Sequence, residues 1–93
     1  MRNECEIKVA GRIWKIKMVD GVRLPRDVLG TCTSPAGRHP TIEIRKNMTD
    51  KKTLEVVIHE IMHASLPLLD EAAVETSAYE ICKGVFAMGW RRV

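Results

Sequence analysis

The stretch TLEVVIHEIMHASL, residues 53–66, combines a helical pattern with a possible metal site. Apolar residues recur in it at intervals of three and four, which predicts an amphipathic helix. The residues of this apolar stripe are Leu54, Val57, Ile58, Ile61 and Met62. His59 and His63 are one helical turn apart and lie on nearly the opposite side of the helix, so both imidazole rings can reach a single metal ion.

Glu60 completes the pattern His-Glu-x-x-His (HExxH). It lies about 100° around the helix from His59, too far round to be a third ligand of the pair but close enough to reach a metal-bound water. There are two alternatives to a metal site. Histidines inside the apolar stripe would be structural residues of the core, and histidines on the surface could be unrelated to one another. Their spacing outside the stripe favours a metal site, with Glu60 as the candidate catalytic residue.

The residues before this helix predict a small sheet. Apolar residues alternate with period two over residues 4–9 and, less strictly, over 13–19, with a short turn between them that predicts a hairpin. Residues 30–33 are a candidate third strand, and 34–40 are predicted to be an exposed loop. The clean alternation over 41–45 predicts a strand, either an inner one or an edge strand that could pair with an extended peptide beside the metal site.

Capping residues mark the ends of two helices. Thr49 or Asp50 can cap the first helix, and the proline at position 67 ends it. Asp70 can cap a second helix from Glu71 to about Met88. The apolar side predicted for this second helix contains Val74, Ala78, Ile81, Cys82 and Val85. Because the linker is short, the two helices should lie roughly antiparallel.

These elements predict an α+β fold in a single domain, residues 1–93, with a small, mostly antiparallel N-terminal sheet packed on two C-terminal helices. The cysteines Cys5, Cys32 and Cys82 are odd in number and share no short spacing, which predicts buried free thiols. The chain has 15 Lys and Arg against 12 Asp and Glu, and only 4% aromatic residues, so nucleic acid is an unlikely partner. Neither a membrane-spanning apolar run nor a signal peptide is present, so we expect a cytoplasmic protein without a membrane partner.

A catalytic zinc ion takes three protein ligands and a water, so the two histidines need one more ligand. Glu71 and Glu75 are the candidates, because both lie on or beside the apolar side of the second helix, where a carboxylate needs a partner. Helical side chains lean toward the N-terminus, which moves the histidine rings away from the linker and favours Glu75 over Glu71. His39 is a further alternative. The glutamate that does not bind the metal could hydrogen-bond a ligating histidine.

A strand, a helix carrying His59, Glu60 and His63, and a following helix carrying a glutamate resemble the gluzincin metallopeptidases. Over roughly residues 41–85 the chain looks most like their minimal phage or bacterial forms and the ImmA/IrrE-like proteins. The resemblance implies a zincin-like minimal domain with one Zn²⁺ per chain, held by the two histidines and Glu75 or Glu71. It also implies a protein or peptide substrate, in the cytoplasm of a bacterial or phage-infected host cell.

The resemblance implies metal-assisted peptide hydrolysis with Glu60 as the general base that takes a proton from an activated water. Tyr79 and His39 are candidates for stabilising the oxyanion. A zinc-stabilised interaction or regulatory module with little or no catalysis is the main alternative, and a fourth protein ligand on the metal would distinguish it. The second alternative is a small basic nucleic-acid-binding protein in which the HExxH pattern occurs by chance. Substrate specificity and oligomeric state are not predicted.

Overall fold

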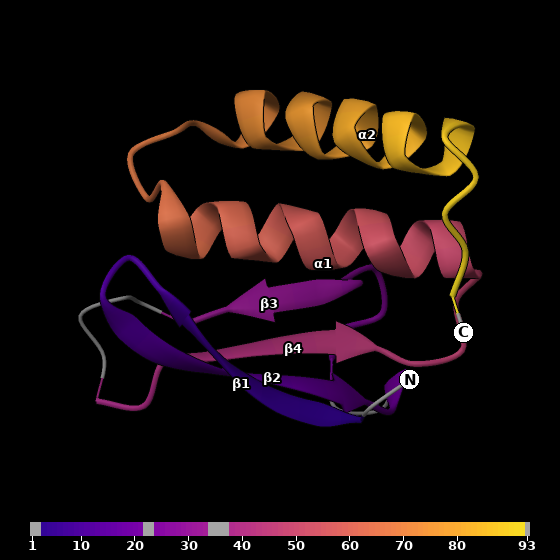
Figure 1. Cartoon of the computed structure of the whole chain (residues 1–93). Helices are drawn as coiled ribbons and strands as arrows, with labels where there is room; N and C mark the ends of the chain where they lie inside the picture. The colour runs from indigo at the N-terminus through magenta and orange to yellow at the C-terminus, as the bar shows by residue number, and fades with distance from the viewer. Residues whose placement is uncertain (1–2, 22–23, 34–37, 93) are drawn as a thin grey trace.

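The computed structural model describes residues 3–21, 24–33 and 38–92, in three layers: a sheet, helix α1 and helix α2 (Figure 1). The strands are β1 (Glu4–Val9), β2 (Arg12–Val19), β3 (Gly30–Cys32) and β4 (Thr41–Arg45), and the helices are α1 (Asp50–Ser65) and α2 (Glu71–Ala87). The order in the sheet is β1-β2-β4-β3, and two of its three strand pairings are antiparallel. The predicted α+β fold, with an N-terminal sheet and two C-terminal helices, is therefore confirmed.

The predicted hairpin of β1 and β2 turns on two residues. Val9 pairs with Arg12, and between them Ala10 and Gly11 have φ angles of 49° and 82°. Positive φ at both central positions gives a turn whose twist matches that of the flanking strands. The hairpin sets the side chain of Trp14 on the core face, where it is 1% exposed.

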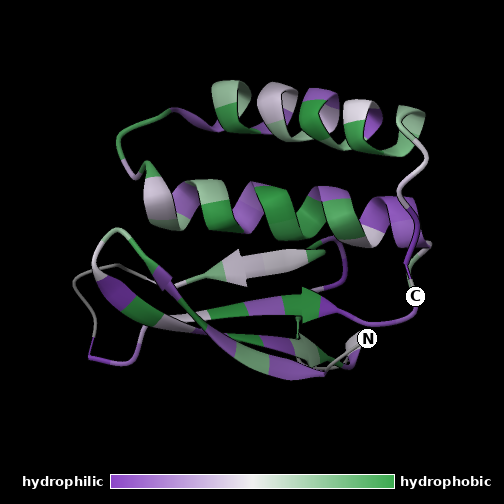
Figure 2. Ribbon diagram, viewed as in Figure 1, coloured by the Kyte–Doolittle hydropathy of each residue, from purple (hydrophilic) through white to green (hydrophobic). Residues whose placement is uncertain are grey.

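Strand β4 lies inside the sheet. It pairs in parallel with β2 and antiparallel with β3, so the alternative of an edge strand at 41–45 is wrong and β3 occupies that edge instead. Alternating hydropathy is visible along the strands (Figure 2). In β4 it sends Ile42 and Ile44 into the core, where both are fully buried. Periodicity showed which way these side chains point, but it carries no information on which strand lies next to which.

Helix α1 is covered on two sides, by the sheet and by α2 (Figure 1). Its buried residues form a line that differs from the predicted apolar stripe: they are Thr53, Val56, Glu60 and Ala64. The residues of the predicted stripe are all half-buried, because a helix between two layers divides its apolar side between them. His59 and His63 are half-buried as well, on a flank that neither layer covers completely.

Helix α2 packs with one side on α1. Val74, Ala78 and Cys82 are buried as predicted, whereas Ile81 is 47% exposed because no third layer covers α2 on that side. The Cys82 thiol donates a hydrogen bond to the carbonyl oxygen of Lys51 over 3.2 Å. This contact joins the C-terminal half of α2 to the first turn of α1.

Both predicted N-caps are confirmed. The Thr49 hydroxyl accepts a hydrogen bond from the backbone N–H of Lys52 over 3.2 Å, and the Asp70 carboxylate accepts one from Ala73 over 2.7 Å. All three cysteines are free thiols, but only Cys82 is buried, while Cys5 and Cys32 are half-buried. In the described part of the chain, no helix has the length and apolar character needed to cross a membrane.

The two faces of the sheet can be tested by a pair of isoleucine substitutions. We expect Ile44→Ala to lower the free energy of unfolding by about 2–5 kcal/mol, because it leaves a cavity in the core. Ile13 is 63% exposed on the opposite face. Ile13→Ala should therefore cost less than about 0.5 kcal/mol. Urea denaturation of the metal-free proteins measures both values, and similar losses in the two variants would contradict this assignment of the faces.

Candidate metal centre

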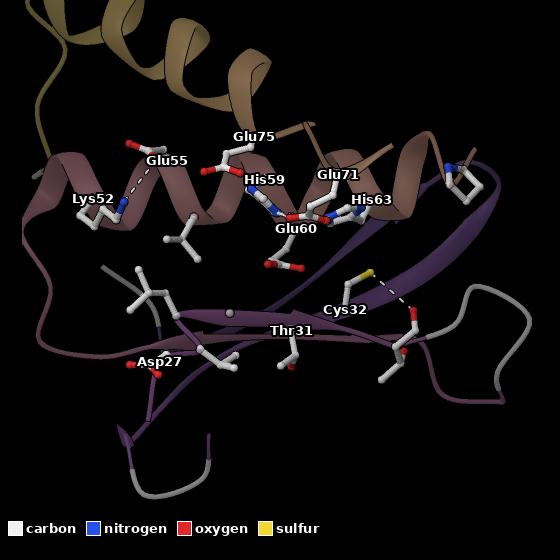
Figure 3. A pocket seen from close by; sticks show the side chains of 16 residues that line it. Asp27, Thr31, Cys32, Lys52, Glu55, His59, Glu60, His63, Glu71 and Glu75 are labelled. Carbon is white, nitrogen blue, oxygen red and sulfur yellow. Dashed lines mark hydrogen bonds and ion pairs between the residues drawn. The ribbon is translucent and has the colours of Figure 1, made fainter. Parts of the chain in front are cut away.

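Three side chains from the two helices converge beside the first turn of α2 (Figure 3). The Nε2 atoms of His59 and His63 are 3.1 Å apart. One carboxylate oxygen of Glu71 lies 2.8 Å from Nε2 of His59, and the other lies 2.9 Å from Nε2 of His63. The donor atoms of the three residues all lie within 4.8 Å of one another, so this cluster could hold a metal ion.

The donors fit a zinc ion. Two imidazole nitrogens and one carboxylate oxygen are a ligand set of known catalytic zinc sites. Bonds of about 2.0–2.1 Å at a tetrahedral ion place two ligands roughly 3.3 Å apart, and the two imidazole nitrogens are already at 3.1 Å. The side chains of His59 and His63 are 21% and 26% exposed, so solvent reaches the cluster. The described residues supply three donors, which leaves one position of a tetrahedral ion for water or substrate.

The structure brings Glu71 to the histidines, rather than the favoured Glu75. The linker, residues 66–70, loops past the end of α1 and returns, so α2 begins alongside α1 (Figure 1). Glu71 in its first turn therefore lies within 2.9 Å of both histidines. The preference for Glu75 assumed a linker that placed the start of α2 at the end of α1. Both glutamates are exposed, contrary to their predicted place on or beside the buried side of the helix. Glu75 lines the same cleft as the cluster but is not part of it.

Glu60 lies on the side of α1 that faces β3 and is 7% exposed (Figure 3). No described residue donates a hydrogen bond to its carboxylate. Burial raises the pKa of Glu60, and the charge of Glu71 adds to this effect, whereas His59 and His63 oppose it. A carboxylate with a raised pKa is a stronger base than an ordinary one, and is therefore better suited to accept a proton.

An open cleft of about 800 Å³ runs between α1 and β3 and contains both the cluster and Glu60. Cys32 on β3 also lines it. Burial, with a further contribution from the charge of Glu60, raises the pKa of the Cys32 thiol to about 11. This thiol therefore stays protonated at neutral pH, which makes it a poor nucleophile and a poor metal ligand.

Gly30 allows β3 to approach α1 closely. A Cβ atom at this position would lie 2.7 Å from Cγ1 of Val56 and 3.1 Å from Cγ of Glu60. Any larger residue would therefore push the strand away from the helix and displace Glu60. This role is not visible in the sequence, because a glycine that opens a three-residue strand is indistinguishable there from a turn residue.

Arg45 fixes the segment that leads into β3. Its guanidinium donates hydrogen bonds to the carbonyl oxygen of Pro25 over 2.8 Å and to that of Val28 over 2.8 and 3.1 Å. This ties residues 25–28, including Asp27 on the rim of the cleft, to the end of β4. The partners are about 20 positions apart in the chain and follow no local pattern, so the sequence did not indicate this role.

Two residues suggested for oxyanion stabilisation do not line the cleft. Tyr79 is 51% exposed on α2, and His39 is exposed before β4. His39 is also outside the cluster of His59, His63 and Glu71 that could hold a metal ion, so its position does not suit a third ligand.

Comparison with known proteins gives no match: no family model, no curated protein and no solved structure is significantly similar to this chain. The geometry of the cluster and the cleft is therefore what indicates a function for this chain.

The ligand assignment predicts different effects for the two glutamates. Glu71→Gln should lower zinc affinity by more than the roughly 10- to 100-fold typical of a lost outer-shell partner, because it removes a direct ligand. Glu75→Gln is the matched control, one turn further along α2, and should keep near one zinc per chain. Elemental analysis measures the zinc content of each variant, and competition with a chromogenic chelator measures its zinc affinity. The reverse order of affinities would establish Glu75 as the ligand.

Glu60 should make the stability of the metal-free protein depend on pH. The pKa of Glu60 is higher in the folded state than in the unfolded state. Its contribution to the free energy of unfolding is therefore fully present below the unfolded-state pKa, and it is lost as the pH rises through the folded-state pKa. Glu60→Gln should therefore raise the melting temperature at pH 8 much more than at pH 4. Each kcal/mol gained in the free energy of unfolding corresponds to roughly 4–8 °C. Thermal unfolding in chelator measures the difference, with Glu80→Gln on exposed α2 surface as control. An equal shift at both pH values would contradict the burial of the charge.

Proposed function

We propose that this chain is a zinc-dependent metallopeptidase that hydrolyses peptide bonds, with Glu60 as general base. One observation carries the proposal: His59, His63 and Glu71 converge on one point beside a buried glutamate, inside an open cleft. Each of these features has another explanation alone. Together they are the parts that metal-assisted hydrolysis needs.

The three ligand residues would hold one Zn²⁺ ion, which would polarise a carbonyl group and acidify water. Glu60 would accept a proton from the attacking water and later deliver it to the leaving amine. Its burial supports this role, because the raised pKa brings the protonated form closer to neutral pH. The close approach of β3 at Gly30 holds the Glu60 side chain on the cleft side of α1.

The edge of β3 supports an extended peptide as substrate. The carbonyl of Leu29 accepts a hydrogen bond from Arg45, and the N–H of Thr33 donates to Thr41, so alternate residues of this segment bond to β4. Gly30 and Cys32 therefore direct their backbone groups away from β4. No described strand pairs with this edge. An unpaired strand edge binds an extended peptide by adding it as a further strand.

The interaction-module alternative has less support. A purely structural zinc site is closed by four protein ligands, whereas the described cluster offers three. The acidic residues that line the cleft also disfavour a nucleic acid there. As the gluzincin resemblance implies, the substrate would be a protein or peptide in the cytoplasm of a bacterial or phage-infected cell.

The proposed chemistry predicts that metal binding and turnover can be separated. Glu60→Gln should keep near one zinc per chain and lose about 10²- to 10⁴-fold in turnover, because it removes the proton acceptor but no ligand. Cleavage of a fluorogenic peptide library by zinc-loaded protein measures turnover, with Glu80→Gln as control and chelator as a further test. Zinc-dependent cleavage that persists in Glu60→Gln would exclude Glu60 as the base. A wild-type protein that binds zinc and cleaves nothing would favour the interaction module.

A further inference from the structure

The cleft is acidic although the chain as a whole is basic. The chain has a net charge of +3. Five acidic residues nevertheless line the cleft: Asp27, Glu55, Glu60, Glu71 and Glu75. Lys52 is the single lysine or arginine among its described lining residues, and its ammonium group lies 3.3 Å from the Glu55 carboxylate. The local potential of the cleft is therefore opposite in sign to the net charge of the protein.

The negative charge is unevenly distributed along the cleft. Figure 3 shows Asp27 and Glu55 toward one end, where α1 begins, and Cys32 and His63 toward the other. A divalent ion at the cluster would offset the nearby charges of Glu60 and Glu71. Lys52 offsets Glu55. Asp27 and Glu75 would then remain without a cationic partner among the described lining residues.

Two observations besides the charge suit this cleft to a ligand. Glu60 is 7% exposed as a residue, and its carboxylate faces the cleft and receives no hydrogen bond from a described residue. The backbone groups of Gly30 and Cys32 point from the open edge of β3 and pair with no described strand. Buried polar groups and strand edges without partners are the places where a bound peptide supplies hydrogen bonds.

We propose that the cleft selects peptides with a lysine or arginine within three residues on the C-terminal side of the scissile bond. This specificity rests on the proposed peptidase function. A peptide that pairs with β3 in the more stable antiparallel sense runs its C-terminal part toward the start of the strand, where Asp27 lies. Asp27 precedes Gly30 by three residues, in the turn that leads into β3, and lines the same cleft. A basic side chain in that part of the peptide would meet Asp27 and Glu75.

The experiment combines a binding readout that needs no catalysis with a cleavage readout. Fluorescein-labelled nine-residue alanine peptides with one central Lys, Gln or Glu are titrated with metal-free protein at low and high salt. Zinc-loaded protein is then incubated with a peptide library from a glutamate-specific digest, which retains internal Lys and Arg. Mass spectrometry records the residues on each side of every cleavage. The test variant is Asp27→Asn with Glu75→Gln, and the matched control is Asp20→Asn with Glu80→Gln at exposed positions outside the cleft.

The Lys peptide should bind about tenfold more tightly than the Glu peptide at low salt, with a smaller ratio at high salt. The test variant should reduce this ratio by about two- to fivefold, and the control should leave it unchanged. Cleavage sites should be enriched in Lys and Arg within three positions on the C-terminal side.

Each contrary result has a distinct meaning. Cleavage without charge preference would overturn the specificity and leave the peptidase function standing. A Lys preference in binding that the test variant removes, without zinc-dependent cleavage, would support the acidic cleft as a peptide site and overturn the peptidase function. Enrichment on the N-terminal side would overturn the proposed orientation, and no binding of any peptide would overturn the inference as a whole.

Discussion

Helix α1 lies between the sheet and α2, and the rest of the structure depends on this placement. Two sides of the helix are covered, one by each layer, and the histidines lie on a flank between them. Because α2 returns along α1, it can place Glu71 over that flank. Because β3 is the edge strand, it leaves the flank open on the sheet side. A cluster that could hold a metal ion and a cleft beside it thus result from the way that one helix is packed.

Burial of Glu60 makes its ionised form unfavourable in the metal-free protein, and the carboxylates around the cleft would favour a positively charged ligand. Glu60 is buried without a hydrogen-bond donor among the described residues, which costs stability when it is ionised. Glu71 bridges both histidines, with separations of 2.8 and 2.9 Å. A metal ion would replace these contacts with ligand bonds and attract the Glu60 charge, so binding would couple favourably to folding. Residues that destabilise a small domain are often retained where function requires them.

Net charge is a poor guide to the cleft. The excess of 15 basic over 12 acidic residues describes the chain as a whole. The fold gathers five of those acidic residues around one cleft, from the segment before β3 and from both helices, with Lys52 as the single lysine or arginine among the described lining residues. Electrostatic recognition depends on this local arrangement, because screening limits each charge to a range of about 10 Å at ordinary salt.

The sequence by itself determined the features that depend on near neighbours in the chain. Helical geometry sets His59 and His63 one turn apart, side-chain chemistry makes Thr49 and Asp70 helix caps, and alternation turns Ile42 and Ile44 inward. These follow from periods of 3.6 and 2 and from local hydrogen bonds, which the order of residues specifies directly.

Only the tertiary structure decided the features that join distant segments. The path of the linker places Glu71, rather than Glu75, beside the histidines. The position of β4 between β2 and β3 makes β3 the edge strand. The close packing of β3 on α1 requires a glycine at position 30. Arg45 reaches back to the carbonyls of residues 25–28 for the same reason. Such contacts depend on how whole elements pack against one another, and a pattern within one element does not record the neighbours that it will meet.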